Sequence, residues 1–476
     1  MSADELRWHL EAPQGRGNLP ADAFTGAAGG AACGDLIRIS LSLGAKGEVA
    51  DAGFEADGCG SAQAAGSAVV ALIRGADLLD AARIGPDEIA AELGGLIPAK
   101  MHAAELAADA LHRALGAAAR EASLEPVEGR TLVAMSGGVD SAVAALLVAR
   151  DGHEAVACTL ELWADAENDG DLSCCSAAAV RSARRLAHGL GMPHLSIDLR
   201  AEFRAGVVDG WLSGHAAGLT PNPCIRCNGD VRLDAMIELG ARLGAGTLAT
   251  GHYARVEQGL LMCAADAAKD QSYVLSGLSP SSLARLRFPL GALEKTRVRE
   301  IAREAGLSVA KRRDSQDLCF LAGTGQAAFL ARHGGIDPRP GAVLTREGEV
   351  LGEHGGSHLY TVGQRRGLGI AAPDPLYVLA TDAAGNTVTV GPREALLSEE
   401  IAVQEMVLHR PGSEVDAVRV RAHGRLHRCR LPGELAAGRH GRASIELLTA
   451  AERTAPGQLA CLYSGELVVG YGTVTA

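Results

Sequence analysis

The sequence predicts a multidomain protein: an α+β domain, then an α/β domain with a parallel sheet, then a region built of β-strands. Three observations lead to this prediction. The first 120 residues combine strand-like alternation with alanine-rich helical patterns. The middle of the chain alternates short apolar strands with helices, an order that favours a parallel sheet covered by helices. From about residue 340, short alternating runs are broken by Gly and Pro, as is typical of β domains.

The N-terminal region is expected to hold two strands joined by a turn, followed by two helices. Apolar alternation marks the strands, and the helical period marks the helices. A segment with Pro126 and Gly129 follows, and these residues are typical of a linker. The expected ranges are strands at 36–43 and 49–56, helices at 61–75 and 99–119, and a linker at 121–130.

The central region is expected to alternate strands and helices, and the C-terminal region to hold strands only. This alternating order favours a parallel sheet with helices on its faces. The expected ranges are central strands at 131–135, 155–160 and 194–199, central helices at 141–150 and 176–190, and later strands at 376–380, 387–390 and 418–422.

Charge and cysteine content narrow the possible functions. The chain has 476 residues, with 57 acidic against 45 basic residues and a formal net charge of −12. This acidity disfavours nonspecific electrostatic binding of nucleic acid. The acidic excess is uneven, however, because residues 1–120 alone hold 16 acidic and 9 basic residues. Eleven cysteines without a secretion signal indicate a reducing compartment. We therefore expect a cytoplasmic protein without a membrane span.

A glycine-rich loop at residues 136–141 follows an expected strand and opens an expected helix. Its sequence is Ser-Gly-Gly-Val-Asp-Ser. Glycines permit the tight turn, and the free amides of a helix start suit a polyphosphate. The loop lacks the lysine of the Walker A motif. The alternative is an ordinary turn between a strand and a helix.

Three cysteines form a second group of interest. Cys224 and Cys227 have C-x-x-C spacing on a proline-rich loop, and Arg226 between them would favour thiolates. Such a pair suits disulfide exchange or metal binding. Cys319 lies far along the chain, after Asp317-Leu318. Half of a structural zinc site is the alternative, but no second pair follows at zinc-ribbon spacing.

Together these motifs resemble those of the tRNA-specific 2-thiouridylase family, which thiolates the wobble uridine of certain tRNAs. The resemblance covers about residues 130–476 and depends on six motifs in the family's order. They are the Ser-Gly-Gly-x-Asp-Ser loop, Pro-Asn-Pro-x-x-x-Cys-Asn at 221–228, Ala-Thr-Gly-His-Tyr at 249–253, Lys-Asp-Gln-Ser-Tyr at 269–273, Ser-Gln-Asp-x-Cys-Phe at 315–320 and Gly-Gln-Arg-Arg-Gly at 363–367.

The resemblance implies two sets of binding residues, one for ATP with Mg²⁺ and one for tRNA. The implied ATP contacts are Ala134, Met135, Ser136, Gly137, Gly138, Val139, Asp140, Ser141, Leu160 and Gly251. The implied tRNA contacts are Asn222, Pro223, Cys224, His252, Lys269, Asp270, Gln271 and Gln364.

The resemblance also implies a chemical sequence. The uridine C2 oxygen is adenylated, and sulfur carried as a persulfide on Cys319 then displaces AMP. Cys227 resembles the nucleophile, and a Cys227–Cys319 disulfide remains for a reductant. Splitting a difficult substitution into activation and thiolate attack is ordinary covalent catalysis. The implied partners are tRNA and a sulfur donor, either a cysteine desulfurase or a sulfur-relay protein.

One departure leaves the sulfur source open. Many family members have Asp where this chain has Cys224. Three thiols, Cys224, Cys227 and Cys319, are then the right number to hold three irons of a [4Fe–4S] cluster, leaving one iron open for hydrosulfide. Both the persulfide relay and the cluster therefore remain as hypotheses.

The N-terminal region resembles the U-type scaffold of iron–sulfur cluster assembly over about residues 20–118. Three segments carry the resemblance: Ala-Cys-Gly-Asp at 32–35, Gly-Cys-Gly-Ser at 58–61, and Ile-Pro-Ala-Lys-Met-His at 97–102. It implies a cluster or zinc site at Cys33, Asp35, Cys59 and His102. The family's third cysteine is replaced by Ala103, so this position has no thiol to accept persulfide. A relic fold used only for docking is the alternative.

The resemblances also divide the chain. We expect a scaffold-like domain at 1–120, a linker at 121–130 and an ATP pyrophosphatase domain with the glycine-rich phosphate loop (PP-loop) at 131–335. A small central β domain at 336–400 and a C-terminal β-barrel at 401–476 would follow. Two other functions remain: another ATP pyrophosphatase of ligase or amidotransferase type, and a non-enzymatic iron–sulfur carrier.

A basic stretch and the remaining cysteines are weaker signals. The stretch is a phosphate-binding surface or a solvated strand face; its basic residues are Arg419, Arg421, His423, Arg425, His427, Arg428 and Arg430. Cys174 and Cys175 precede a helix and are expected at its start. Cys158, Cys263, Cys429 and Cys461 are expected in the core.

Overall fold

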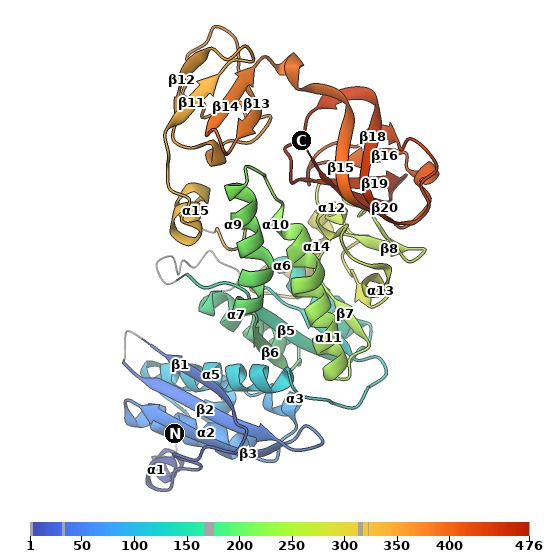
Figure 1. Cartoon of the computed structure of the whole chain (residues 1–476). Coiled ribbons are helices and arrows are strands. Elements are labelled where there is room, and N and C mark those ends of the chain that lie inside the picture. Colours follow the sequence, from blue (N-terminus) through green and yellow to red (C-terminus); the bar gives the residue numbers. More distant parts are fainter. Residues whose placement is uncertain (1–2, 31–33, 166–175, 313–317, 322, 476) are drawn as a thin grey trace.

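A computed structural model describes residues 3–30, 34–165, 176–312, 318–321 and 323–475. Figure 1 shows an elongated molecule with the N-terminal domain at one end, an α/β domain in the middle and two β domains at the other end. This architecture confirms the predicted fold class. Cys33, Cys174, Cys175 and most of the motif before Cys319 lie outside the described residues.

Within those residues, no helix has both the length and the apolar character needed to cross a bilayer.

The N-terminal domain is an antiparallel three-stranded sheet with helices packed against it. Both predicted helices are present, and each begins or ends within two residues of its expected bounds. Strand β1 was not predicted, because its sequence Phe-Thr-Gly-Ala-Ala-Gly has little β propensity. The elements are α1 (Ala3–Glu11), β1 (Phe24–Gly29), β2 (Leu36–Leu43), β3 (Val49–Asp57), α2 (Gly60–Ile73), α3 (Leu78–Ala81), α4 (Pro86–Glu92), η1 (Pro98–Lys100) and α5 (Met101–Ala119).

The segment between the first two domains is held in place by backbone hydrogen bonds. It has neither helix nor strand among its described residues, as expected for a linker. The amide of Leu124 donates to the carbonyl of Arg242, and that of Val127 donates to the carbonyl of Gly244. Both carbonyls lie at the end of helix α11, so the linker follows the surface of the α/β domain.

The α/β domain contains a five-stranded parallel sheet in the order β10-β7-β4-β5-β6. Chain order reverses beside β4, and ligands of such sheets bind at the carboxyl ends of the strands near the reversal. The strands are β4 (Thr131–Ala134), β5 (Ala155–Glu161), β6 (His194–Asp198), β7 (Thr247–Ala249) and β10 (Leu286–Arg287).

Helices cover both faces of this sheet. Those with eight or more residues are α6 (Val139–Arg150), α7 (Ala177–Gly189), α9 (Asp209–Ala216), η3 (Cys227–Asp234), α11 (Ala235–Arg242), α14 (Lys295–Glu304) and α15 (Gln326–Gly334). The shorter ones are α8 (Arg200–Phe203), η2 (Arg204–Val208), α10 (Pro223–Arg226), α12 (Ser272–Leu275) and α13 (Pro280–Leu283). Ser176 caps α7 by accepting a hydrogen bond from the amide of Ala179 at 3.2 Å, which explains why that helix starts as predicted.

The last two domains are β structures, as predicted. The central one has the strand order β12-β11-β14-β13, and the C-terminal one is a six-stranded barrel closed by pairing of β15 with β20. The hairpin β8–β9 of the α/β domain extends the barrel sheet through the pair Leu467–Met262. The strands are β8 (Arg255–Glu257), β9 (Leu260–Met262), β11 (Gly341–Leu344), β12 (Val350–His354), β13 (Tyr377–Asp382), β14 (Thr387–Gly391), β15 (Leu397–Leu408), β16 (Ala417–Arg419), β17 (His427–Arg430), β18 (Gly438–Glu452), β19 (Leu459–Ser464) and β20 (Leu467–Val474).

Three short 3₁₀ helices connect the β elements: η4 (Ser357–Leu359), η5 (Arg393–Leu396) and η6 (Gly412–Glu414).

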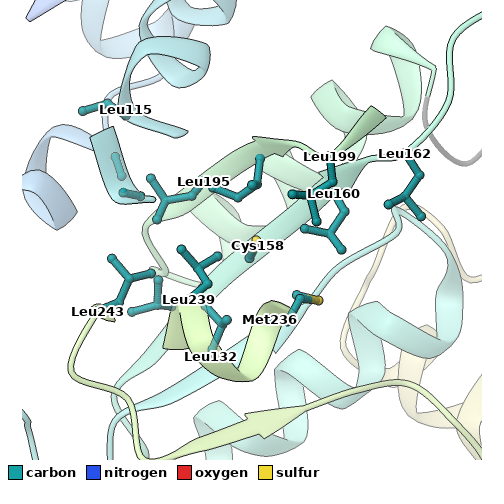
Figure 2. Packing of buried hydrophobic residues seen from close by; sticks show 14 of the residues in the cluster. Leu115, Leu132, Cys158, Leu160, Leu162, Leu195, Leu199, Met236, Leu239 and Leu243 are labelled. Carbon is teal, nitrogen blue, oxygen red and sulfur yellow. The ribbon is translucent and has the colours of Figure 1, made fainter. Parts of the chain in front are cut away.

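A single hydrophobic core runs from the N-terminal domain into the α/β domain. It includes Leu115 of α5, Leu195 of β6 and Leu239 of α11 (Figure 2). Because buried apolar area is the main source of folding free energy, a shared core makes the two domains stabilise one another. The sequence did not predict this continuity.

Helix α5 lies directly on β6, the edge strand of the parallel sheet. A Cβ added at Gly116 would lie 1.8 Å from the carbonyl oxygen of Ser196, so the two backbones meet without room for any side chain. The ring of His112 is held by the carbonyls of His194 and Ile84, each at 2.9 Å. The helix therefore covers an edge that would otherwise be open to pairing.

Two ion pairs fasten α5 to helix α7. Asp109 accepts hydrogen bonds from Arg181 at 2.7 Å and from Arg184 at 2.6 Å. The Arg184 side chain is 3% exposed and that of Asp109 is 12% exposed. Because this pair is buried, loss of one partner would leave an uncompensated charge in the interface.

We predict that Asp109→Asn lowers the free energy of unfolding by about 3 kcal/mol, since it leaves Arg184 without its carboxylate. Asp80→Asn is the matched control, because Asp80 pairs with Arg83 at the surface, with side chains 69% and 45% exposed. That control should change stability by no more than about 0.5 kcal/mol. Denaturant unfolding of both variants measures the difference in stability. Equal unfolding midpoints for the two variants would contradict a stabilising role for the buried Asp109–Arg184 ion pair.

Candidate active site

A cavity of about 310 Å³ opens at the carboxyl ends of β4, β5 and β7. This is the position expected for a ligand of a parallel sheet with reversed strand order. Its lining includes many of the predicted site residues. They are Ala134, Met135, Ser136, Asp140, Ser141, Leu160, Gly251, His252 and Gln271, together with Cys158, Thr159, Leu162, Arg232, Met236 and Thr250.

The glycine-rich loop turns from β4 into α6 as predicted. Gly137 has a φ of 71°, which only glycine adopts readily. Ser141 supports the turn, since its hydroxyl donates to the carbonyl of Gly138 at 3.1 Å and accepts from the amide of Ser136 at 3.1 Å. The Val139 side chain is buried in the core, so its contribution to ligand binding would come from its backbone.

Gly251 brings the end of β7 against the start of α6. A Cβ at this position would lie 2.7 Å from the amide nitrogen of Ser141 and 2.8 Å from the carbonyl carbon of Asp140. Glycine is therefore needed so that the two segments can form one wall of the cavity.

Asp140 is held by two partners that the sequence analysis missed. Lys295 Nζ lies 2.7 Å from both carboxylate oxygens, and the hydroxyl of Tyr253 donates to Oδ1 at 2.8 Å. Lys295 starts α14, far along the chain from the loop. No sequence motif surrounds Lys295, so its position next to the glycine-rich loop is seen only in the folded structure.

His252 lies in the cavity wall as a neutral base. Its side chain is buried, with Nδ1 2.8 Å from the Thr250 hydroxyl and Nε2 accepting a hydrogen bond from Arg232 at 3.2 Å. Burial first, and the Arg232 charge second, lower the pKa of His252 to about 3. The imidazole is therefore uncharged at neutral pH, and Arg232 supplies the positive charge of this wall.

The C-x-x-C pair lies at the junction of α10 and η3. Asn222 caps α10 by accepting from the amide of Cys224 at 3.1 Å, and Pro223 starts the helix. Burial, with a smaller effect from neighbouring Cys227, raises the pKa of Cys224 to about 11. The Cys224 thiol is therefore neutral at neutral pH. Cys227 is 7% exposed.

Cys319 is positioned by an aromatic cluster around its neighbour. The Phe320 ring lies 5.2 Å from Phe329, 5.4 Å from Trp211 and 6.0 Å from Phe203, and these edge or tilted contacts bury it. Five of the chain's fifteen aromatic residues gather here, the fifth being Trp163. The cluster fixes one side of the segment that carries the Cys319 thiol.

The predicted tRNA residues fall into separate groups. Asp270 is 6% exposed and pairs with Arg419 of the barrel at 2.5 Å, so its carboxylate joins two domains. Gln271 lies in the cavity wall, where Oε1 accepts from the amide of Tyr253 at 2.9 Å. Lys269 lies beside them in the same loop.

Gly363, the residue before Gln364, lies close to Arg421 although the two belong to different β domains. A Cβ at Gly363 would lie 3.3 Å from Arg421 Nη2. Gln364 is fixed by hydrogen bonds to Thr361 and Arg366 within its own loop. Arg421 is exposed.

The basic stretch does not form one continuous surface. Arg419 turns inward to Asp270, whereas Arg428 and Arg430 pair with Asp416 and Glu446. Arg421, His423 and Arg425 are exposed, and Arg428 and Arg430 stay 70% and 71% exposed within their surface ion pairs, so these side chains remain open to phosphate.

Asp35, Cys59 and His102 form a ligand cluster in the N-terminal domain. Their donor atoms all lie within 4.8 Å of one another. Asp35 Oδ1 accepts from the amide of Cys59 at 2.8 Å, and its Oδ2 lies 3.3 Å from both Cys59 Sγ and His102 Nε2. The hydrogen bond from the Cys59 amide lowers the pKa of Asp35.

Two further features make this cluster suited to a soft metal. His102 Nδ1 faces the carbonyl of Ala99 at 3.0 Å, which directs the Nε2 lone pair toward the cluster in the neutral tautomer. Gly58 has a φ of 143°, and a Cβ there would lie 2.0 Å from Asp35 Oδ1. Among the described residues, no other set of three such donors is as close. Thiolate, imidazole and carboxylate together fit zinc or iron.

Four domain-family profiles match consecutive parts of the chain. They are a NifU-like N terminal domain at residues 2–122, a tRNA methyl transferase HUP domain at 129–323, a tRNA methyl transferase PRC-barrel domain at 327–392 and an aminomethyltransferase beta-barrel domain at 398–474.

Relatives match either the whole chain or its larger C-terminal part. The bifunctional protein NifU/MnmA of Rubrobacter xylanophilus is 41% identical and covers 98% of this chain and 97% of its own length. The tRNA-specific 2-thiouridylase MnmA of Thermobifida fusca is 42% identical over 72% of this chain and 95% of its own length. That of Geotalea uraniireducens is 38% identical, with shares of 72% and 94%.

A solved 4-thiouridine synthetase–RNA complex with bound ATP overlaps 42% of this chain and 47% of its own, at 20% identity and a TM-score of 0.27. A similarity this low carries no argument about the site.

We predict that Gly251→Ala weakens ATP binding about tenfold or more, because the added methyl group pushes the start of α6 out of place. Gly246→Ala is the matched control at the opposite end of β7, where an added Cβ meets no atom within 4 Å. Titration calorimetry with ATP measures both. Unchanged affinity in Gly251→Ala would show that this wall does not bind the nucleotide.

Proposed function

The chain belongs to the bifunctional NifU/MnmA family, and on that basis we propose that it thiolates C2 of the wobble uridine in tRNA at the expense of ATP. The observation that carries the proposal is the cavity at the sheet's carboxyl edge. Its wall contains Asp140 and Gly251 from two family motifs, and two further family motifs supply the reactive thiols Cys227 and Cys319. Phosphate loop and thiols together are required only for a sulfur-transferring member of the ATP pyrophosphatases.

The first step is adenylation of the uridine C2 oxygen, with release of pyrophosphate. The amides at the start of α6 would bind phosphate oxygens, and the positive charges of Lys295 and Arg232 flank the cavity. Mg²⁺ normally accompanies a triphosphate and needs few protein ligands. Asp140 is the acidic residue in the cavity wall and would be its ligand from this chain.

The second step is sulfur attack at C2. In the persulfide form, the terminal sulfur on Cys319 bonds to C2 while the C–O bond to AMP breaks. Cys227 then attacks the Cys319 sulfur that remains attached to the product, which releases 2-thiouridine and leaves a Cys227–Cys319 disulfide. An external reductant must supply two electrons before the next cycle. Burial of Cys227 protects this step from competing thiols.

A cluster is the second candidate for the sulfur source. The two thiols of the C-x-x-C pair interact electrostatically across one helical junction, and Cys224 stands where many relatives have a carboxylate. Three thiolates would hold three irons and leave the fourth to bind hydrosulfide. Under this alternative, Cys224 is a required ligand of the cluster, whereas the persulfide route does not need its thiol.

Recognition of tRNA would depend on a few placed residues. The loop that contains Gln364 approaches Arg421 at Gly363, between the two β domains, and Asn222 caps the helix that carries Cys224. Phosphate contacts position a nucleic acid, whereas contacts to bases select it. We assign Arg421 to the first role and Asn222 to the second.

The N-terminal domain would supply sulfur or a cluster through Cys33, Asp35, Cys59 and His102. Donor chemistry and spacing of the three described residues fit iron or zinc. The sulfur donor feeding this site would be a cysteine desulfurase or a relay protein. Ala103 is fully buried in α5 and has no thiol to accept persulfide, so this role falls to Cys59.

We predict that the purified chain releases pyrophosphate from ATP only in the presence of tRNA, and that deletion of its gene removes 2-thiouridine from tRNA. Cys227→Ser and Cys319→Ser should retain pyrophosphate release but abolish thiolation, because adenylation precedes sulfur transfer. Mass spectrometry of tRNA nucleosides gives the readout. Unchanged 2-thiouridine after deletion would refute the function, and release without tRNA would favour a ligase or amidotransferase.

The two sulfur sources make different predictions for anaerobically purified protein. A persulfide enzyme should have no iron or colour that depends on Cys224, since iron at the N-terminal ligand cluster would be unaffected, and Cys224→Ser should keep most of its activity. A cluster enzyme should be brown, contain iron and sulfide, and lose both its absorbance and its activity in Cys224→Ser. Iron and sulfide assays with the absorbance spectrum decide between them.

A further inference from the structure

Helix α5 crosses the edge of the parallel sheet from one face to the other. Near its middle, Asp109 binds α7, which packs on the face that contains Val133 and Ala157. At its end, Arg120 donates to Glu202 of α8 at 2.5 Å, on the opposite face. The linker continues along that second face to the end of α11.

The ligand cluster lies at the start of α5, whereas the reactive thiols lie in the core on the face of the sheet that the end of α5 reaches. His102 lies at the first turn of α5, before the helix reaches Asp109 on the α7 face. Cys227 and Phe320 belong to the core on the other face, together with Cys158 of β5. The axis of α5 from His102 to Arg120 alone is about 27 Å long.

Figure 1 shows the same separation. The elements that carry the cluster, β2, α2 and α5, form the domain at one end of the molecule, whereas α10 and α15 lie near the β domains at the other side of the α/β domain. A persulfide can pass between two cysteines only when their sulfur atoms come into contact.

The interface leaves no simple motion that would close this gap. Gly116 contacts the backbone of β6 without side-chain clearance, and the amide of His194 donates to the carbonyl of Ala82 across the domains at 3.0 Å. The buried Asp109–Arg184 pair and the shared core would both have to break. The domains are joined as one packed unit, unlike modules on a flexible linker.

We propose that sulfur held at Cys59 is delivered to Cys319 of a second copy of this chain, and not to Cys319 of its own. The proposal rests on the supply role assigned above to the N-terminal domain. The His102 side chain is 37% exposed, so the cluster is open to another molecule. Joining the two domains in one chain thus keeps donor and acceptor in equal amounts, but it does not bring the donor and acceptor sites of one chain together.

The transfer is a thiol–persulfide exchange between two molecules. The Cys319 thiolate attacks the outer sulfur of the Cys59 persulfide, so that one S–S bond breaks as another forms. Cys59 leaves as a thiolate and takes up the proton that Cys319 lost. The oxidation state of the transferred sulfur does not change, and no further reductant is needed.

Two full-length variants, each lacking one thiol, test the route. Cys319→Ser is first incubated with a cysteine desulfurase and ³⁵S-labelled cysteine, so that labelled sulfur is loaded onto it. The desulfurase and the free labelled cysteine are then removed. The loaded Cys319→Ser protein is mixed with Cys59→Ser, ATP and tRNA. Transfer between copies predicts labelled 2-thiouridine, although neither variant makes it alone, and a tenfold dilution of the acceptor should slow labelling about tenfold.

The controls separate this route from the supply role itself. Replacing the acceptor with the double variant Cys59→Ser/Cys319→Ser should abolish labelling, as should charging the double variant as donor. A charged donor that yields no labelled tRNA in the mixture would overturn transfer between copies. If Cys319→Ser carries no more label than the double variant after incubation with the desulfurase, then Cys59 does not hold sulfur, and its supply role is refuted as well. Free sulfide can open the Cys227–Cys319 disulfide of Cys59→Ser, which leaves a persulfide on Cys319 and a thiolate on Cys227. Thiolation started in this way shows separately that the acceptor is intact.

Discussion

The contact of α5 with the edge strand β6 is the constraint on which the rest of the structure depends. The two backbones approach so closely at Gly116 and Ser196 that no side chain can separate them. An edge strand offers unpaired backbone groups, and a helix laid over it removes that liability. This packing merges the hydrophobic cores of the two domains into one. The orientation of the ligand cluster relative to the reactive thiols follows from it.

The same parallel sheet also places the nucleotide site. Strand order reverses beside β4, so the carboxyl ends of β4, β5 and β7 diverge around the cavity. Gly251 closes one wall, and the Asp140–Lys295 pair closes another. Backbone amides and placed cations would provide the charge for phosphate binding there. The overall charge of −12 is therefore no obstacle to a site for ATP and tRNA.

Sequence reasoning succeeded where the signal is local and failed where it depends on the fold. Short segments of sequence determine several features: the turn of the glycine-rich loop, the helices that begin near Val139 and Met101, and the spacing of the thiols. Lys295 escaped notice because its partner Asp140 is brought to it only by the packing of α14. The motif of Asp270 gave no sign that its carboxylate pairs with Arg419 of the barrel in the interior. Glycine-rich β1 is a strand because its neighbour β2 pairs with it, against its own propensity.

The rigid interface changes what a fusion of these two domains can achieve. Linked modules normally gain from a high effective concentration, but only when the linker lets their sites meet. Here the linker is hydrogen-bonded to α11, and the elements that carry the two sites lie on opposite sides of the α/β domain (Figure 1). The advantage of a shared chain then lies in equal production of donor and acceptor, and in the mutual stability of two domains that share a core. Selection on Gly116 and Asp109 would preserve that stability even in a chain whose ligand cluster had lost its function.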